Sequence, residues 1–392
     1  MGKTIIRGGA VVAPDHVIEE GTVTIEDGVI TDVGGCRPEG PGAAMIDASG
    51  CMVCPGLIDI HIHGAAGADT MDASSASLDA MAQFAAARGV TGFLPTLMSM
   101  PLPTMVKACE RVVDFMRSQR RGAAVLGINA EGPFLSQTAR GAQPADGVIL
   151  PDRQVLHSLI YASDGHLKIM SVAPELEGAL DLIEALAQSD ITAAIAHTEA
   201  TYDQTIAAAR AGASLVTHTF NAMRGLHHRE PGTLGAALTH PGLTCEVIAD
   251  GVHVHPAAVA LVVKAKSCEG VALVTDAMRA AGLGDGRSEL GGQAVNVKNG
   301  QARLDNGTLA GSILTMDRAF ANVRSFTGAT PVEAAMMAST VPARLIGLGH
   351  RKGRIAPGMD ADITIIGPNG EVARTIVAGN TVYEGVLKVV NG

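Results

Sequence analysis

The chain has 392 residues, 47% of them hydrophobic, only 3% aromatic, and a formal net charge of −10. This length accommodates one α/β barrel of about 250 residues together with a smaller module, and an acidic chain without a basic run disfavours nucleic acid or an anionic membrane as a partner. No window of about 18 uncharged apolar residues predicts a membrane span, and the N-terminal sequence lacks the pattern of a secretory signal, so we expect a cytoplasmic protein.

Short β-type segments separated by turns fill residues 1–56. Alternation from Thr22 to Ile25, followed by the turn sequence Glu26-Asp27-Gly28, predicts a hairpin. Residues 348–392 have the same character, with GRIAPGMDADITIIG followed by EVARTIVAGNTVYEG. We expect these two terminal segments to pair into one small β-sandwich domain.

Residues 57–347 alternate between apolar β-type runs and helical stretches. The eight runs cover residues 57–63, 90–97, 123–131, 167–173, 191–197, 214–218, 243–249 and 271–276, and the helical candidates include 77–87, 103–117, 177–187, 202–211 and 256–266. Eight buried strands joined by helical crossovers predict an α/β fold with a (β/α)8 TIM-type barrel. No GxGxxG motif follows the first strand, which disfavours a dinucleotide-binding sheet.

Metal-competent side chains stand at the ends of five of these runs: His61 and His63, Glu131, His197, His218 and Asp276. The carboxyl ends of barrel strands open on one face, so we expect the six groups to converge there. Side chains at i and i+2 of a strand point the same way, which lets both histidines of the first run reach one ion. Ionisable groups in buried strands need a partner or a metal.

The ligand types indicate hydrolysis. Imidazole and carboxylate suit Zn²⁺ first, and also Fe²⁺, Mn²⁺ or Co²⁺, and the absence of cysteine ligands argues against a closed structural zinc site. Such an ion activates water at neutral pH and polarises a carbonyl group. Asp276 is the best candidate for a general base that later protonates a leaving amine. This is the machinery of amide hydrolysis, and the absence of a GxSxG motif disfavours a serine mechanism.

Seven motifs carry a family resemblance: PGLIDIHIHG, NAEGPF, HTFNAM, HHREPG, IADGVHVHP, LVTDAM and GTLAGSILTM. In this order they resemble the N-acetylglucosamine-6-phosphate deacetylase family of the amidohydrolase superfamily. The resemblance runs nearly end to end and includes GRIAPGMDADI near the C-terminus. It implies hydrolysis of the acetamide of N-acetyl-D-glucosamine 6-phosphate to D-glucosamine 6-phosphate and acetate.

The resemblance also assigns roles to individual positions. Glu131, His197 and His218 match the main metal site, and Asp276 matches the catalytic aspartate. His61 and His63 fall where some relatives bind a second ion. The chain has both histidines, so we expect a site for one or two divalent ions, with Glu131 bridging when two are bound.

Further positions match the family's contacts with its phosphorylated amino sugar: Ala142, Gln143, Asn221, Ala222, Arg229, His253, Leu309, Ala310 and Gly311. Among them, Arg229 and His253 match residues that contact the phosphate, for which the arginine fork is well suited. In the family that arginine reaches across a dimer interface, which implies a homodimer. Leu309, Ala310 and Gly311 resemble the loop over the substrate.

Gln143 is a departure, because relatives have a histidine at this place, where it helps to polarise the acetyl carbonyl. An amide still donates a hydrogen bond to a developing oxyanion but carries no charge. We hypothesise that a second metal ion at His61 and His63 compensates for the lost electrophile.

Three alternatives stay open at this point. N-acetylgalactosamine 6-phosphate differs from the first substrate at one hydroxyl, and the sequence does not separate the two epimers. A dihydroorotase-like enzyme or an N-acyl amino acid hydrolase would commonly need a bridging lysine, and here only Lys168 lies near, at the start of its strand. A barrel without activity that serves in assembly is disfavoured because every candidate ligand is present.

Overall fold

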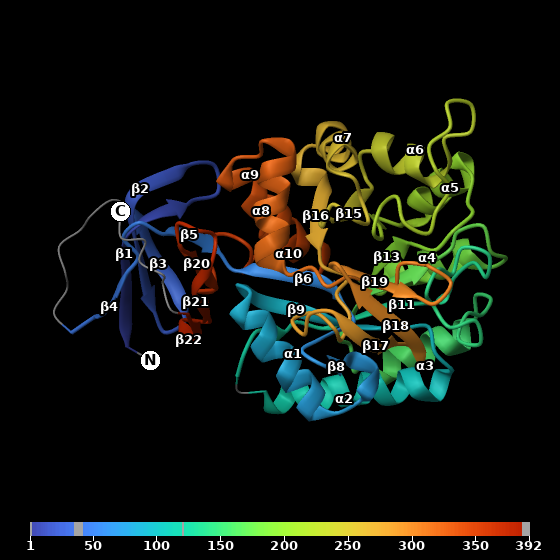
Figure 1. Cartoon of the computed structure of the whole chain (residues 1–392), viewed down its shortest axis with the longest axis horizontal. Helices are drawn as coiled ribbons and strands as arrows, with labels where there is room; N and C mark the ends of the chain where they lie inside the picture. The colour runs from blue at the N-terminus through green and yellow to red at the C-terminus, as the bar shows by residue number, and fades with distance from the viewer. Residues whose placement is uncertain (1, 35–41, 120, 386–392) are drawn as a thin grey trace.

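The computed structural model describes residues 2–34, 42–119 and 121–385. It contains a (β/α)8 barrel and a smaller β domain beside it, built from the two ends of the chain (Figure 1). Parts of the predicted terminal segments, residues 1, 35–41 and 386–392, lie outside the described residues. Within the described part, no helix combines the length and the apolar character needed to cross a bilayer.

The barrel strands follow one another in chain order and pair in parallel. Each described strand is buried along most of its length, as expected for a sheet covered by helices. The strands are β6 (Leu57–Ile62), β9 (Val90–Leu97), β11 (Ile128–Phe134), β12 (Leu167–Val172), β13 (Thr192–Ile195), β14 (Leu215–Val216), β15 (Thr244–Ile248) and β16 (Val271–Val274).

The barrel closes between β16 and β6 by contacts at the ends of these strands. The amide of Asp276 donates to the carbonyl of His61 at 2.8 Å, and the amide of His63 donates to the carbonyl of Ala277 at 2.9 Å. Lower in the seam, the hydroxyl of Thr275 donates to the buried carboxylate of Asp59 at 2.5 Å. This seam therefore fixes three of the predicted functional residues relative to one another.

The helices that surround the barrel begin and end at recognisable signals. For example, Thr201 and Gln204 form a capping box at the start of α5, and Gly212 ends that helix in the left-handed conformation. The helices are α1 (Ser75–Ala87), α2 (Leu102–Ser118), α3 (Arg153–Ala162), α4 (Ala179–Gln188), α5 (Tyr202–Ala211), α6 (Gly232–Thr239), α7 (Pro256–Lys266), α8 (Met316–Thr327), α9 (Pro331–Ala335) and α10 (Val341–Leu345). The five predicted helices agree within two residues at each end.

The small domain is one continuous hydrogen-bonded sheet in the order β22-β21-β20-β5-β1-β2-β3, with β4 on β1. β5 and β20 pair antiparallel and so join the two ends of the chain, and the sheet encloses a core of its own. The hairpin with Asp27 and Gly28 at its turn is confirmed. The strands are β1 (Lys3–Val12), β2 (Val17–Glu26), β3 (Val29–Gly34), β4 (Ala44–Asp47), β5 (Met52–Pro55), β20 (Ile363–Ile366), β21 (Val372–Val377) and β22 (Asn380–Glu384).

A three-stranded antiparallel sheet after the last barrel strand is an addition that the sequence analysis did not predict. It comprises β17 (Gly286–Leu290), β18 (Gln293–Lys298) and β19 (Gln301–Leu304). Its apolar side packs with Met98, Met278 and Ala310 at the mouth of the barrel. Short elements complete the described chain: β7 (Gly64–Ala65), β8 (Ala68–Asp69), β10 (Ala124–Val125), two 3-10 helices (Thr70–Asp72 and Cys268–Gly270) and a π-helix (Met336–Thr340).

The ends of several predicted strands need correction. The run 123–131 is divided into β10 and β11 around Gly127, whose φ is 151°, and β11 continues three residues beyond Glu131. β13, β14 and β16 each end two residues before the histidine or aspartate that was predicted to end the strand. These functional candidates therefore stand on the first turns after the strands.

Candidate active site

Three of the predicted ligands have an unusual backbone conformation. His197, His218 and Asp276 have φ values of 43°, 28° and 48°, in the left-handed region that side chains other than glycine seldom adopt. All three lie at the carboxyl end of the barrel, two residues after a strand. Strained backbone of this kind gathers at functional sites, where the surrounding structure holds a side chain in one direction.

One compact group of ligand atoms consists of Glu131, His197 and His218. Glu131 Oε1 lies 3.0 Å from the Nε2 atom of each histidine, and the two Nε2 atoms lie 3.1 Å apart. All three side chains are at least 93% buried. The predicted main metal residues are therefore brought together.

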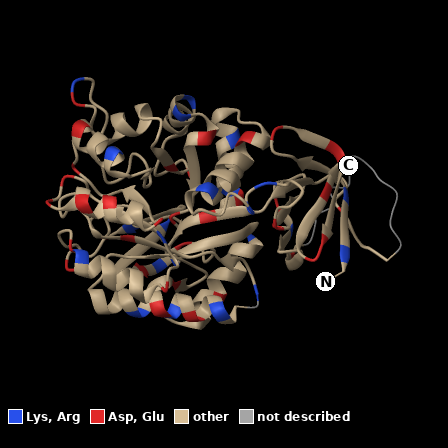
Figure 2. Cartoon of the chain, turned by 180° about the vertical axis from the view of Figure 1, so that it is seen from behind, with Lys and Arg blue, Asp and Glu red and all other residues tan. Residues whose placement is uncertain are grey.

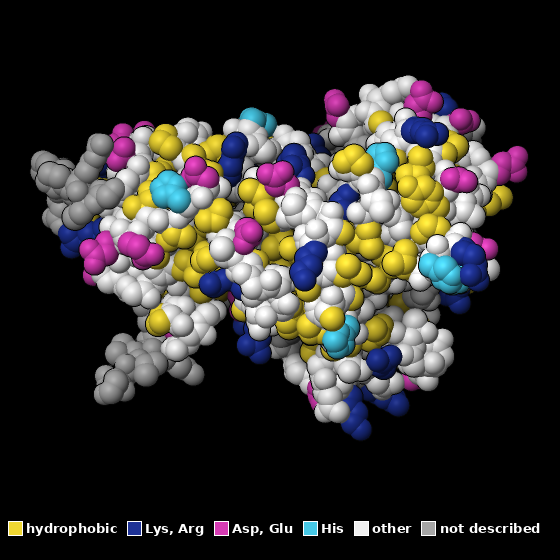
Figure 3. Space-filling view, turned by 90° about the horizontal axis from the view of Figure 1, so that it is seen from above, with side chains coloured by type: hydrophobic (Ala, Val, Ile, Leu, Met, Phe, Trp, Pro, Cys, Tyr) yellow, Lys and Arg dark blue, Asp and Glu magenta, His cyan; other side chains and the backbone are white. Residues whose placement is uncertain are grey.

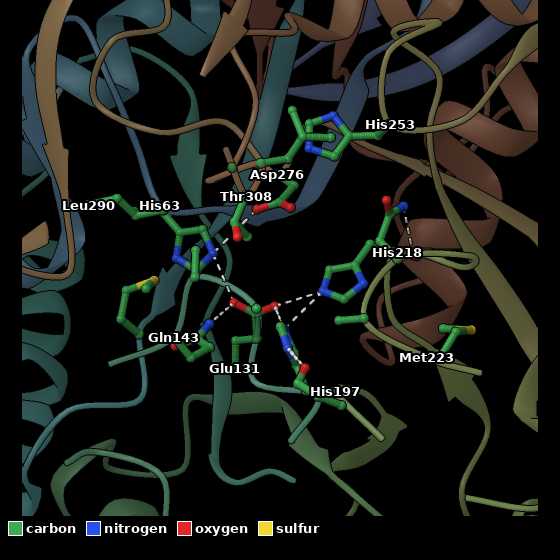
Figure 4. A pocket seen from close by; sticks show the side chains of 18 of the residues that line it. His63, Glu131, Gln143, His197, His218, Met223, His253, Asp276, Leu290 and Thr308 are labelled. Atoms are coloured by element: carbon green, nitrogen blue, oxygen red, sulfur yellow. Dashed lines mark hydrogen bonds and ion pairs between the residues drawn. The ribbon is translucent and has the colours of Figure 1, made fainter. Parts of the chain in front are cut away.

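A second group consists of His61, His63 and Asp276. The Nε2 atoms of the two histidines are 3.4 Å apart, and Asp276 Oδ1 lies 3.6 Å from the first and 3.4 Å from the second. Glu131 joins the two groups, because its Oε2 lies 3.0 Å from His63 Nε2 while its Oε1 faces the first group (Figure 4).

The spacing fits divalent metal ions. Ligand atoms about 2.0–2.2 Å from one ion lie about 2.8–3.6 Å from each other, depending on coordination geometry. The separations within both groups, 3.0–3.1 Å and 3.4–3.6 Å, fall in this range. The donor set of imidazole nitrogen and carboxylate oxygen suits zinc and neighbouring transition metals. The residues present can thus hold a divalent metal.

The outer nitrogens of the histidine rings have different partners. His63 Nδ1 donates to the carbonyl of Thr96 at 3.3 Å, and His197 Nδ1 donates to the carbonyl of Ala139 at 3.0 Å. His61 Nδ1 instead faces the carboxylate of Glu246 at 3.1 Å. Glu246, fully buried on β15, was missed by the sequence analysis, although a glutamate within the apolar run LTCEVIA was the same signal that singled out Glu131.

Burial disfavours the charged form of each ionisable side chain at this centre. The ion pairs between carboxylates and imidazoles have the opposite effect on the pKa values, and it is larger. The charge of His61 and the histidine hydrogen bonds hold the pKa of Glu131 well below its ordinary value. The carboxylates of Asp276 and Glu131 raise the pKa of His63 to about 9, and that of His61 well above its ordinary value. The pKa of Asp276 is lowered by His61 and His63. In the metal-free protein these groups therefore stabilise one another as ion pairs.

A pocket of about 410 Å³ opens above the two groups. Most of the predicted substrate residues line it, namely Ala142, Gln143, Asn221, Ala222, His253, Leu309 and Gly311. Further lining residues that the sequence analysis missed include Met98, and Met223, Leu290 and Thr308, which are labelled in Figure 4. Within the described residues no lysine is part of the lining.

Two predicted contacts lie elsewhere. Ala310 is completely buried in the small core under β17–β19, to which Met278 and Leu290 also belong, and it is not part of the pocket lining. Arg229 is exposed on the loop before α6, which projects at the edge of the barrel in Figure 1, and its guanidinium contacts His228 at 2.7 Å. In this chain alone, Arg229 does not reach the pocket.

Gln143 is held on both ends of its amide. Its Oε1 accepts a hydrogen bond from the amide of Ser99 at 2.8 Å, and its Nε2 donates to Glu131 Oε2. Gln143 is also part of the pocket lining, and its amide nitrogen carries a second hydrogen besides the one donated to Glu131.

Comparisons with known proteins agree with this geometry. The profile of the Amidohydrolase family matches residues 52–382. The chain is 40% identical over 383 residues to N-acetylglucosamine-6-phosphate deacetylase of Bacillus subtilis (strain 168), covering 97% of both chains. It is 38% identical to N-acetylgalactosamine-6-phosphate deacetylase of Escherichia coli O157:H7, covering 96% of this chain and 98% of that protein.

A solved structure is similar along the whole chain. It is a mutant of N-acetyl-D-glucosamine-6-phosphate deacetylase from Mycobacterium smegmatis in complex with N-acetyl-D-glucosamine-6-phosphate. The TM-score is 0.92 at 31% identity, with 97% of this chain and 100% of that chain covered.

Proposed function

The chain belongs to the amidohydrolase family, within the branch of the N-acetylglucosamine-6-phosphate deacetylases, and on this premise we propose that it hydrolyses the acetamide of N-acetyl-D-glucosamine 6-phosphate to D-glucosamine 6-phosphate and acetate. The observation that carries the proposal is the pair of ligand groups joined by Glu131 at the floor of the pocket. We further propose that they hold two ions, with Zn²⁺ before Fe²⁺, Mn²⁺ or Co²⁺.

Bound divalent metal makes water nucleophilic at neutral pH and draws electron density from the acetamide oxygen. Asp276 is assigned to the proton transfers: it takes a proton from the attacking water and gives one to the amine nitrogen as the C–N bond breaks. Its place beside His61 and His63, at 3.6 and 3.4 Å, supports this role because it faces the centre from the edge of the pocket. Gln143 is assigned to the acetyl oxygen through its remaining amide hydrogen.

The phosphate of the sugar is assigned to His253 and to an arginine from a second copy of the chain. His253 Nδ1 is fixed by Asp250 Oδ2 at 2.7 Å, which leaves Nε2 for a ligand at the pocket wall. Arg229 is exposed on its own chain, which supports a homodimer in which each copy supplies this residue to its partner. The face seen in Figure 3 mixes apolar side chains with charges of both signs, and residues of both charges are spread along the ribbon in Figure 2. The exposed Leu226 stands on the same loop as Arg229.

A cytoplasmic location is part of the proposal. The cysteines in the described part of the chain are all free thiols, and four of the five are buried. Free thiols are typical of reducing compartments.

The galactosamine epimer is the second candidate substrate, because the relative that carries this name is nearly as similar as the first, at 38% against 40% identity. Purified enzyme is given both acetamido-sugar phosphates and unphosphorylated N-acetylglucosamine, and acetate release and metal content are measured on one sample. We expect fast release from N-acetylglucosamine 6-phosphate and slow release from the unphosphorylated sugar. Equal rates of acetate release from N-acetylglucosamine 6-phosphate and from the unphosphorylated sugar would contradict the assignment of the phosphate contacts. If metal-loaded enzyme released no acetate from any of the three compounds, the proposed function would be wrong.

A further inference from the structure

Glu246 is a buried carboxylate directly behind the metal ligands. It lies in the middle of β15 between Cys245 and Val247, and its side chain has no exposed surface. Its Oε2 accepts a hydrogen bond from His61 Nδ1 at 3.1 Å and another from the main-chain amide of His218 at 3.2 Å. Its Oε1 has no hydrogen-bond partner within the described residues.

The hydrogen bond between Glu246 and His61 determines which ring nitrogen of His61 carries the proton. A carboxylate accepts the Nδ1 proton, so it selects the tautomer whose Nε2 lone pair is free to bind a metal. In this tautomer Nε2 points toward His63 and Asp276, which are the other members of the second group. The rings of His63 and His197 are held by neutral carbonyl oxygens instead, and His218 Nδ1 has no partner within the described residues.

The charge on Glu246 also affects how many ions the centre favours. Three carboxylates contact these imidazoles: Glu131, Asp276 and Glu246. Two divalent ions bring four positive charges to this buried centre, against two negative charges on Glu131 and Asp276 and three when Glu246 is counted. An unbalanced charge away from solvent is costly. Glu246 therefore lowers the excess positive charge of the two-ion centre from two units to one, and so favours binding of the second ion.

Resting on the proposed deacetylase centre, we propose that Glu246 is the positioning residue of the second ion: through Nδ1 of His61 it fixes that ring and strengthens it as a ligand, so that the group of His61, His63 and Asp276 holds an ion. It touches only the main chain of His218, so the group of Glu131, His197 and His218 depends on it much less. Partners of this outer kind typically change metal affinity by about 10–100-fold.

The test uses the metal-free full-length enzyme titrated with Mn²⁺. Free and bound Mn²⁺ are followed by electron paramagnetic resonance, in which two adjacent ions give a spin-coupled spectrum and one ion does not. For Glu246→Gln, which keeps the size of the side chain and loses its charge, we expect about 10–100-fold weaker binding of the second ion. Binding of the first ion stays within a few-fold of the wild-type value, and the coupled spectrum disappears at intermediate Mn²⁺ concentrations.

Two comparisons separate positioning from general damage. Glu175→Gln is the matched control, because Glu175 accepts hydrogen bonds from Thr198 and from the amide of Glu199, next to a ligand, but touches no ligand side chain; it should leave both affinities unchanged. In a His61→Asn background, adding Glu246→Gln should weaken manganese binding no further. If Glu246→Gln does not fold, Glu246→Asp, which withdraws the carboxylate by one methylene, should show the same selective loss.

The inference is overturned if Glu246→Gln binds the second Mn²⁺ ion as tightly as the wild type does, or if it loses the same factor of affinity for both ions. It is also overturned if the wild-type enzyme binds only one ion at every Mn²⁺ concentration. None of these readouts uses the sugar substrate. Failure of the deacetylase assay and failure of the ion titration are therefore separate results.

Discussion

Replacing Gln143 by leucine removes two hydrogen bonds at the centre and one donor from the pocket, with little change in volume. The completely buried amide of Ser99 loses its acceptor, which costs about 1–3 kcal/mol. Glu131 loses a hydrogen bond of the charged kind, worth about 1.5–3 kcal/mol. We therefore expect the metal-free variant to be less stable than the wild type by about 2.5–6 kcal/mol in urea unfolding.

The same change should slow catalysis. Loss of one donor to a developing oxyanion typically lowers kcat about 10²–10³-fold, or about 2.7–4 kcal/mol. The assay is acetate release from saturating N-acetylglucosamine 6-phosphate by metal-loaded enzyme of measured metal content. Gln137→Leu is the control, because Gln137 also makes two amide hydrogen bonds in this loop, to the carbonyls of Ala145 and Val148, but does not line the pocket. If Gln143→Leu kept its metal and a kcat within threefold of the wild type, the assignment of Gln143 to the acetyl oxygen would be wrong.

Asp276→Asn should lower kcat about 10²–10⁴-fold with little change in folding, as acetate assays and circular dichroism would show, and full activity would exclude Asp276 as the base. Removing metal with a chelator should lower thermal stability, because ions at 100 times their Kd stabilise by about 2.7 kcal/mol; an unchanged melting temperature on reloading Zn²⁺ would contradict this. Lys352→Met should destabilise by about 3–5 kcal/mol near neutral pH, because it leaves the buried Asp362 without its cation, whereas Asp360 keeps Arg351. Burial alone would lower the pKa of Lys352 and raise that of Asp360. The carboxylate of Asp362 nevertheless raises the pKa of Lys352, and Arg351 lowers the pKa of Asp360. The stabilisation should thus be full between about pH 4 and pH 10, and shrink as acid protonates Asp360 or alkali deprotonates Lys352. A difference between the two proteins that did not vary with pH from 3 to 11 would refute the ion-pair account.

The barrel could be predicted because its strands are buried on both faces and its helices are long. The strand at Val90–Leu97 and the helices Tyr202–Ala211 and Pro256–Lys266 agree at both ends. The sheet of β17–β19 was missed, although Gly291-Gly292 and Asn299-Gly300 are typical hairpin turns, because its strands are half-exposed and lack the apolar runs that mark the barrel.

The candidate site was predictable wherever a polar residue interrupts an apolar run, but its distances were not. The carboxylate of Glu131 has five polar partners. They come from β6 and the residue after it, from the turns after β13 and β14 and from the loop that carries Gln143, and only the closed barrel brings these segments together. The place of Ala310 follows from packing under a sheet that was not foreseen. Arg229 is exposed and does not line the pocket of its own chain, and neither feature could be read from the sequence.

In the metal-free centre, six ionisable side chains are buried together away from water because their charges compensate one another. Burial penalises each charge, but Glu131 and Asp276 raise the pKa of His61, His63 and His218, so carboxylate and imidazolium balance one another before any ion is bound. Because the pKa of His63 is about 9 in this state, an ion that uses its Nε2 must displace at least one proton at pH 7. The barrel thus positions the ligands with protons in the place of the ions. In the proposed function, the same carboxylates that hold those protons become ligands when metal replaces them.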